Sequence, residues 1–479
     1  MELFNIDSNI KDLLNDVNEK LESGLNKEAD LSTGKRNIEG FWQYLVTCES
    51  YFLNGDYKEN YHHDYENMTA LYFLNELIDK NLLTRALRDV LGIPPSKITT
   101  EMLEEWSDGW VAGDGTLYVI SKYCQLDVGW FLSLGYYILY KVLPFLIHPF
   151  GTNPEGKTKV SNNSIPPSAK IAIIGDWGTG IWSDGETPKC PSQLVMEGVI
   201  SEDPDYIIHL GDVYYAGTKG EETSNFLERI PLKYKGKFYT MNSNHEMYDG
   251  ANGLMKNTLK DARFTHQNQT TYFSFEIGEW IIVGLDSAYY DESPLYMDGI
   301  IATKHGGQEQ LEFLTKAYNS GKKVFLCTHH NGIEVDKNGP KPNNPMWDQI
   351  LGATAPHIPD VWYWGHVHNG IVYNDNLSIY GEKKTRDGNG PLMRCCGHAS
   401  IPFGNAPYLQ DLINGPNPEV LYYSHTKMPP PLDKQQQLRV KNGFAIVELS
   451  GDQITETFYE VAIKDGKFEK TQCWSSAPA

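Results

Sequence analysis

Side chains of the types that bind metal ions follow several short apolar runs in the second half of this chain. The runs end, in chain order, at Asp176, Asp212, Asn244, His329 and the pair His366–His368. Carboxylate and amide oxygens together with imidazoles suit iron, zinc or manganese better than calcium or magnesium. The set is too large for a single ion, but it suits two ions that share one bridging Asp. This pattern predicts metal-dependent hydrolysis of a phosphate ester and therefore indicates an enzyme.

The order and spelling of these motifs resemble the calcineurin-like metallophosphoesterase superfamily, and within it the purple acid phosphatase branch. That branch spells the second motif GDxxY, as Gly211–Tyr215 does here, and it carries Gly two residues after the first Asp, as Gly178 does. The resemblance covers residues 168–465 and implies an α/β fold in which a two-sheet β-sandwich is flanked by helices. One departure is Ser243, which stands where relatives carry Gly before Asn-His-Glu.

The resemblance also implies that two metal ions divide the ligands and share Asp212. One ion is expected to be Fe(III), and the other Zn, Mn, Fe(II) or Mg. The ferric ion would take Asp176, Asp212, Tyr215 and His368, and the second ion would take Asp212, Asn244, His329 and His366.

Two adjacent tyrosines follow Asp212, and only Tyr215 has the spacing of the GDxxY motif. A phenolate is a hard donor that favours a ferric ion, since a trivalent neighbour is needed to depress a phenol pKa from about 10. We therefore expect Tyr215 to be the ligand. We expect Tyr214 to be a buried aromatic residue.

Two histidines beside the ligands are candidates for catalysis. His245 is expected to face the substrate and protonate the leaving oxygen, because imidazole titrates near neutrality. His330 follows a ligand and is expected to line the substrate pocket or to stand behind the ligands. The resemblance implies that a metal-bound hydroxide attacks phosphorus. Further residues expected near the pocket or behind the ligands are Glu246, Asp286, His305 and His398.

From residue 168 onward the pattern alternates between strand-like and helix-like segments, with the ligands at the carboxyl ends of the strands. Expected helices include Ser192–Ile200 and Gln308–Asn319. Three late runs, Leu392–Cys396, Phe444–Leu449 and Ile454–Glu460, are expected to be antiparallel strands. The earlier expected strands are Ile171–Gly175, Tyr206–Leu210, Lys237–Met241, Tyr272–Phe275, Ile281–Leu285, Val324–Thr328 and Val361–Trp364.

The chain is expected to divide at a polar, turn-rich linker over residues 151–168. We expect residues 1–150 to form a helical domain of unknown role. Residues 169–465 are expected to form the catalytic domain, with an insertion near 370–440, and residues 466–479 are expected to form a tail. The apolar run 128–147 approaches the length of a membrane span, but Lys141, Ser133 and Pro144 interrupt it. A buried helix is the favoured interpretation, and membrane contact is the alternative.

The composition is that of a soluble globular protein, with 41 basic and 62 acidic residues and a formal net charge of −21. No basic face is available for a nucleic-acid backbone, so the expected partner is a phosphate-ester substrate. The cysteine count of seven is odd, and the chain has no CxxC pair, which indicates reduced thiols. The first residues lack a basic and an apolar signal region, so we expect a cytoplasmic protein.

Three functions are compatible with this pattern. The first is a phosphomonoesterase, and the second is a phosphodiesterase acting on a cyclic nucleotide or a lipid headgroup. A non-catalytic scaffold is the remote third, because the ligand set is complete. The second motif disfavours a serine/threonine protein phosphatase, since that branch spells GDxxDRG and Gly211–Gly217 contains no Arg.

Overall fold

The computed structural model describes the greater part of the chain from residue 144 onward. It covers residues 144–151, 165–181, 190–231, 234, 236–336, 338–401, 409–413, 418–424, 440–464 and 466–476, with single residues and pairs between 110 and 140. The chain forms two compact units. The first comprises Met1–His148 and Tyr248–Gly250, and the second Pro149–Met247 and Ala251–Ala479.

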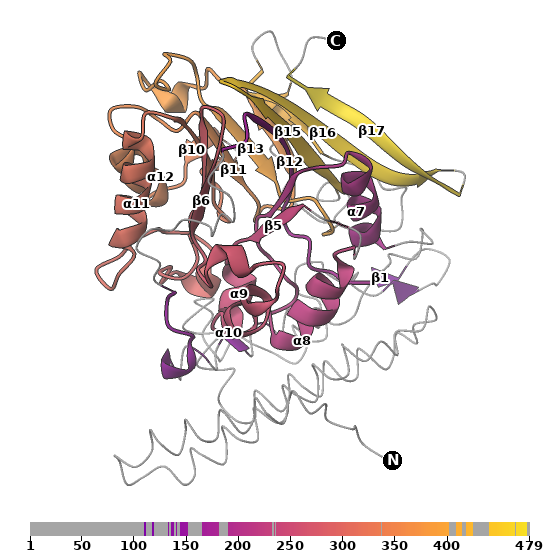
Figure 1. The fold of residues 1–479 in the computed structure, drawn as a ribbon. Helices are drawn as coiled ribbons and strands as arrows, with labels where there is room; N and C mark the ends of the chain where they lie inside the picture. Colours follow the sequence, from indigo (N-terminus) through magenta and orange to yellow (C-terminus); the bar gives the residue numbers. More distant parts are fainter. Residues whose placement is uncertain are drawn as a thin grey trace, which may run out of the picture. The chain divides into compact units, whose positions relative to one another are not determined.

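The second unit contains a mixed seven-stranded sheet (Figure 1), with the strand order β14-β12-β13-β11-β8-β7-β6. The central strands β7, β8, β11 and β13 run parallel, and the outer strands are antiparallel to their neighbours. The strands span Phe273–Ile277 (β6), Trp280–Gly284 (β7), Lys323–Cys327 (β8), Val361–Trp364 (β11), Gly370–Tyr373 (β12), Leu392–Cys396 (β13) and Val420–Tyr423 (β14).

A six-stranded sheet, with the order β17-β16-β15-β3-β4-β5, lies against the first. Strands β3, β4 and β5 are parallel, while β15, β16 and β17 are antiparallel. These strands span Ser168–Ile174 (β3), Tyr206–His209 (β4), Lys237–Thr240 (β5), Gly443–Ser450 (β15), Gln453–Lys464 (β16) and Lys467–Ser475 (β17). Parallel strands in one sheet have their carboxyl ends at the same edge. The loops that follow the parallel strands of each sheet therefore lie together at that edge.

Helices and short hairpins complete the fold. Helix α7 packs on β15 and β16, and α11 packs against α12 beside the seven-stranded sheet (Figure 1). The helices span Pro191–Ser201 (α7), Lys219–Glu221 (α8), Asn244–Tyr248 (α9), Asn252–Lys256 (α10), Gln308–Asn319 (α11), Met346–Ala353 (α12) and Leu409–Leu412 (α13). The small strands span Trp110–Val111 (β1), Leu117–Tyr118 (β2), Ile333–Asp336 (β9) and Gly339–Pro342 (β10).

Two apolar clusters hold these layers together. The interior cluster takes side chains from both sheets, among them Ile173, Phe325 and Val447. The outer cluster joins the other face of the seven-stranded sheet to α11 and α12 through residues such as Leu314 and Ile350. Each sheet and each amphipathic helix thus buries an apolar face, which is the requirement that drives layered folds.

The fold confirms the predicted two-sheet sandwich flanked by helices, and the predicted strands and helices lie within a few residues of the observed ones. Three details differ. Strand β13 is parallel to β11, so only its pairing with β12 is antiparallel. Strands β12 and β14 lie inside the expected insertion, and β17 lies inside the expected tail. These strands were not predicted for two reasons. A short apolar run such as β12 shows too little periodicity to be recognised as a strand, and β17 has no fully buried face that would give an alternating pattern.

Most of the predicted N-terminal helical domain, and most of the apolar run 128–147, lies outside the described residues. Within the first unit, the Tyr140 hydroxyl donates to the Asp249 carboxylate at 3.0 Å. No helix in the described part of the chain has the length and apolar character needed to cross a membrane.

Candidate metal centre

The predicted ligands occupy sharply turned loops at the carboxyl ends of the parallel strands. Asp176 follows β3, Asp212 follows β4, and His366 and His368 follow β11. All four have left-handed backbone conformations, with φ values of 58°, 75°, 67° and 53° respectively. Such values are uncommon for residues other than glycine and concentrate at functional sites, where the surrounding structure holds them. The backbone conformations of these loops therefore set the directions of the four side chains.

Two glycines make the tight approach of these loops possible. A Cβ atom at Gly178 would lie 2.3 Å from the Cα of Val213, so no larger residue fits between the loops after β3 and β4. Gly211 has a φ of +100°, which strongly favours glycine, and a Cβ atom there would lie 3.0 Å from Nδ1 of His329. Steric constraints thus explain why the first and second motifs carry glycine at these two positions.

Asp176, Asp212 and His368 form the first ligand group. Their candidate ligand atoms all lie within 4.8 Å of one another. His368 Nε2 is 3.3 Å from Asp176 Oδ1 and 3.8 Å from Asp212 Oδ2. Asp176 Oδ1 is buried and accepts no hydrogen bond from any described residue, which leaves a carboxylate oxygen available for a cation.

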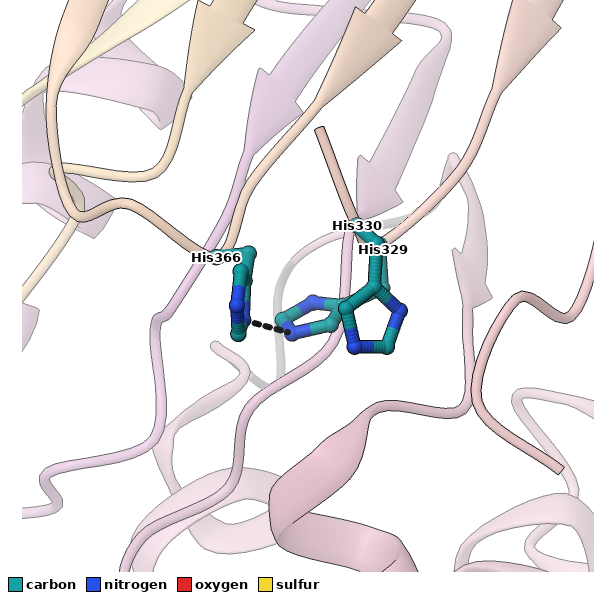
Figure 2. A group of neighbouring side chains, drawn as sticks. All are labelled: His329, His330 and His366. Carbon is teal, nitrogen blue, oxygen red and sulfur yellow. Dashed lines mark hydrogen bonds between the residues drawn. The ribbon is translucent and has the colours of Figure 1, made fainter. Parts of the chain in front are cut away.

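Asn244, His329 and His366 form the second ligand group. His329 Nε2 lies 2.8 Å from Asn244 Oδ1 and 3.2 Å from His366 Nδ1, and Figure 2 shows the two imidazoles converging. His329 donates its Nδ1 proton to the carbonyl of Leu210 at 2.8 Å, which leaves the Nε2 lone pair facing the group. This is the tautomer and the outer hydrogen bond that metal-binding histidines usually show.

Asp212 stands between the two groups. Its Oδ1 lies 3.2 Å from His329 Nε2 in the second group, and its Oδ2 lies 3.8 Å from His368 Nε2 in the first. One carboxylate thus faces both groups with different oxygens, which is the geometry required of a bridging ligand.

Burial and neighbouring groups shift the pKa values of the two carboxylates in opposite directions. Burial raises the pKa of Asp176 well above its ordinary value, and the adjacent Asp212 raises it further. Burial also acts to raise the pKa of Asp212, but His329, His245 and hydrogen bonds from neighbours outweigh it, so the pKa of Asp212 lies well below its ordinary value. Without a cation, the pair therefore carries its negative charge mainly on Asp212.

Burial keeps the imidazoles of the second group neutral. It lowers the pKa of His329 to about 3, and it lowers the pKa of His366 well below its ordinary value. A neutral imidazole offers its lone pair without losing a proton first, which favours metal binding. The buried carboxylates, the amide oxygen and these neutral imidazoles therefore fit metal ions.

His245 is buried beside the first group and has a defined tautomer. Its Nδ1 donates to the backbone carbonyl of Tyr215, because a carbonyl can only accept. The ring centroid lies 3.9 Å from that of Tyr214. Burial lowers the pKa of His245, although Asp212 opposes the shift. Any proton that His245 transfers must therefore move through Nε2.

A network of buried carboxylates and hydroxyls lies behind the ligands. Glu246 accepts from the backbone N–H groups of Asp212 and Val213 at 3.2 and 3.1 Å. Ser243 donates from its hydroxyl and contacts both Asp212 and Glu246. Burial, followed by Asp212, raises the pKa of Glu246 to about 8. Glu246 thus orients the Asp212 loop rather than His245, and the role of Ser243 was not visible from the sequence.

Asp286 also acts behind the ligands. It accepts from Asn242 Nδ2 at 3.1 Å and from the backbone of Ala288 and Tyr289. Burial raises the pKa of Asp286. Because Asn242 precedes the Ser243–Asn244 turn, this contact ties the loop of the second group to the loop after β7.

His330, one of the two predicted catalytic histidines, lies beside His329 and His366 (Figure 2), with its ring centroid 4.9 and 4.6 Å from theirs. The candidate ligand atoms of the three histidines lie within 4.8 Å of one another. Its Nε2 donates to the Tyr296 carbonyl at 2.7 Å, and its Nδ1 lies 2.9 Å from the Ser287 hydroxyl. Both ring nitrogens are therefore occupied by protein groups. His330 therefore adjoins the second ligand group, and its role in catalysis stays a prediction.

Two other histidines lie away from the ligand groups. His305 has a side chain that is 62% exposed and pairs with Glu292 at 3.4 Å. His398 is fully buried and stacks on Phe458 inside the sandwich. The fold thus brings neither histidine into the two ligand groups, because a histidine in a loop after a strand has no fixed side-chain direction.

The two tyrosines have contacts that spacing does not predict. The Tyr214 hydroxyl donates to Asp212 Oδ2 at 3.1 Å and lies 2.5 Å from His368 Nε2. The backbone carbonyl of Tyr215 holds His245. Tyr214 therefore contacts the first group, and ligation by Tyr215 stays a prediction.

The loop that carries Tyr214 and Tyr215 is held by Glu221, a residue that sequence reasoning missed. Glu221 accepts from the backbone N–H groups of Ala216 and Thr218 at 2.9 and 3.1 Å. The pattern Thr218-x-x-Glu221 is a capping-box signature, and it is the signal that points to this carboxylate in the sequence.

The chain resembles several solved structures at low sequence identity. The chain matches no curated protein. Among solved structures it resembles purple acid phosphatase PPD1 from yellow lupin (Lupinus luteus) seeds, at 16% identity and a TM-score of 0.41, covering 62% of this chain and 52%, about half, of that one. It also resembles GAP50, the anchor in the inner membrane complex of Plasmodium (14%, TM-score 0.40, covering 64% and 89%), and a dimetal phosphatase from Danio rerio (13%, TM-score 0.35, covering 60% and 94%).

The family comparison covers the ligand loops themselves. Residues 169–370 match the model of the family described as calcineurin-like phosphoesterase. This span begins in β3 and ends at the start of β12, so it includes every member of both ligand groups. The region that builds the candidate metal centre is therefore the part of the chain that resembles the calcineurin-like phosphoesterase family.

Proposed function

We propose that this protein is a dimetal-dependent hydrolase of phosphoric monoesters. The observation that carries the proposal is the position of Asp212, whose two oxygens face different ligand groups. The GDxxY spelling of the second motif supports a phosphatase over a diesterase, because it is the spelling of the purple acid phosphatase branch.

The residues of each group suit a different ion. The first group, with two carboxylates and a nearby phenol, suits Fe(III), since hard anionic donors favour a trivalent ion. The second group, with two neutral imidazoles and an amide oxygen, suits Zn, Mn, Fe(II) or Mg. Two bound ions would polarise the phosphoryl oxygens and lower the pKa of a coordinated water.

The chain's own groups would position the reactants and supply the proton. Asp212 would hold the two sites at a fixed separation, and the left-handed loops of Asp176 and His366 would keep their ligand atoms directed inward. His245, fixed through Nδ1, would donate a proton from Nε2 to the leaving oxygen. Burial lowers the pKa of His245, so a proton on Nε2 would be transferred readily.

The test is a substrate panel on protein reconstituted with defined metals, measured across pH. The panel comprises p-nitrophenyl phosphate, an alkyl phosphate, bis(p-nitrophenyl) phosphate, a 3′,5′-cyclic nucleotide and glycerophosphocholine. We expect kcat/KM to be highest for the monoesters. Asp212→Asn is the control, because it should abolish any activity that belongs to this protein.

Two outcomes would replace the proposal. Faster turnover of a diester would identify a phosphodiesterase acting on a cyclic nucleotide or a lipid headgroup. Full metal loading with no turnover of any substrate would identify a non-catalytic scaffold that uses the fold for binding.

A further inference from the structure

The loop between β7 and α11 runs beside the second ligand group. The sulfur of Met297, in this loop, lies 3.7 Å from Nδ2 of the ligand residue Asn244. The carbonyl of Tyr296 accepts from His330, and a Cβ atom at Gly299 would lie 2.4 Å from the Cβ of His330. This part of the loop therefore packs directly against the second ligand group and its neighbour.

Side-chain oxygens within the loop fix its conformation. Asp291 accepts from the backbone N–H groups of Ser293 and Gly299 at 2.7 and 2.8 Å. The Ser293 hydroxyl accepts from the backbone N–H groups of Met297 and Asp298 at 2.9 and 3.0 Å. Bonds of this kind, from short polar side chains to nearby backbone, hold a turn in one conformation. The position of Met297 is therefore set before a substrate binds.

The backbone turns here in a way that residues other than glycine rarely adopt. Leu295 and Tyr296 are consecutive, and their φ values of 57° and 52° are left-handed. Both side chains are buried, whereas the next one, that of Met297, is 40% exposed. A single exposed apolar side chain is ordinary on a protein surface. One that follows a strained, fixed turn and contacts a ligand residue points to a function, because such strain concentrates at functional sites.

Met297 shapes the surface beside Asn244 in two ways. A thioether sulfur can only accept a hydrogen bond, so its contact with Nδ2 leaves the amide Oδ1 facing His329, at 2.8 Å. The exposed part of the side chain is unbranched, polarisable and apolar, and it adapts to the shape of a bound group. His245, the proposed proton donor, follows Asn244 directly in the chain. Met297 therefore stands near the place where a leaving alcohol would lie.

We propose that Met297 forms an apolar subsite for the leaving alcohol, and that the preferred substrates are phosphate monoesters of apolar alcohols rather than of sugars. The inference rests on the proposed function, because it concerns the alcohol of the monoester that the centre would hydrolyse. Ligand sites combine a few placed polar groups with apolar walls. The two ligand groups supply the polar part, and Met297 supplies an apolar wall beside them.

The experiment compares methyl phosphate with n-butyl phosphate on the full chain reconstituted with defined metals. The measured quantity is the ratio of kcat/KM for the butyl ester to that for the methyl ester. We expect a wild-type ratio of at least about 5, since full burial of each of the three additional methylenes would give about fourfold. Met297→Gln, which has a similar length but a polar end, should lower the ratio towards 1. Met297→Leu, which stays apolar, should retain most of it.

Leu421→Gln is the matched control. Leu421 is 39% exposed, much as Met297 is, but it lies on the edge strand β14, and the variant should keep the wild-type ratio. A loss of ions caused through Asn244 would slow both esters alike and would cancel in the ratio. A wild-type ratio near 1 would overturn the inference, and so would an unchanged ratio in Met297→Gln.

Binding without turnover separates this inference from the proposed function. Calorimetry with methylphosphonate and n-butylphosphonate, which contain no ester bond, measures the subsite directly. We expect the butyl compound to bind more tightly to the wild type and to Met297→Leu, and this preference to disappear in Met297→Gln. Hydrolysis of monoesters without any such preference would refute the subsite alone. The preference in binding without turnover of any ester would refute the proposed function and leave the apolar subsite standing.

Discussion

Asp212 Oδ1 lies 3.2 Å from His329 Nε2, although the two residues are 117 positions apart and come from different sheets. The contact joins the carboxyl end of β4 to that of β8 across the sandwich. Since the other oxygen of the same carboxylate faces His368, the two halves of the candidate metal centre depend on one side chain. The distance between the two sheets at this edge therefore sets the geometry of the centre.

Loss of Asp212 is expected to empty both halves of the centre. Asp212→Asn removes the charge and one oxygen donor, whereas Asn244→Ala removes a ligand of the second group alone. Changing an outer partner of a metal ligand costs roughly 10–100-fold in affinity, so Asp212→Asn should cost at least that for both ions. Elemental analysis of metals per chain checks this. Equal metal loss in the two variants would contradict a bridging role.

Metal removal is expected to abolish activity and to destabilise the fold. The first group buries two neighbouring carboxylates, and a bound cation offsets both their repulsion and their desolvation. Free metal at 100 times its Kd would add about 2.7 kcal/mol to the free energy of unfolding. Thermal unfolding before and after chelation, with readdition of metal, measures this. A chelated protein with unchanged activity and unchanged unfolding temperature would exclude the dimetal proposal.

His245→Asn is expected to slow the hydrolysis of substrates with poor leaving groups. Proton transfer by a positioned side chain contributes about 10²–10⁴-fold in rate, and an alkoxide needs that proton more than a p-nitrophenolate does. The measured quantity is the ratio of kcat/KM for an alkyl phosphate to that for p-nitrophenyl phosphate. His305→Asn is the matched control, because His305 is exposed and pairs with Glu292. Equal loss on both substrates would assign His245 to another role.

His398 is expected to make stability depend on pH in the acid range. Burial lowers the pKa of this histidine to about 3, so the folded protein keeps it neutral while the unfolded chain takes up a proton near pH 6.5. The unfolded state then binds more protons, and stability falls as the pH drops from about 6.5 towards 3.

The test replaces His398 with leucine. Between pH 6.5 and 5.0 the free energy of unfolding of the wild type should fall by roughly 1.5 kcal/mol more than that of His398→Leu. Urea denaturation at the two pH values measures the difference, and any fixed loss of packing cancels. Identical pH dependence in the two proteins would show that His398 is already protonated, or paired, in the folded state.

The sequence by itself located the ligand loops and most of the strands, and the resemblance of its motifs to a known family implied the two-sheet fold. Apolar runs of strand length, each ending in Asp, Asn or His, carry that information locally, and parallel strands bring their carboxyl ends to a common edge. Gly178 and Gly211 were readable for the same reason, because the steric need for a glycine is a property of the loop.

Only the tertiary structure decided where the side chains around the ligands point. Spacing pointed to Tyr215, and the structure also places the Tyr214 hydroxyl at Asp212 Oδ2, after the left-handed turn at Asp212. His330 is occupied by Ser287 and Tyr296, which lie 43 and 34 residues earlier in the chain. A side-chain direction depends on such distant partners and on loop torsions, and neither leaves a periodic trace in the sequence.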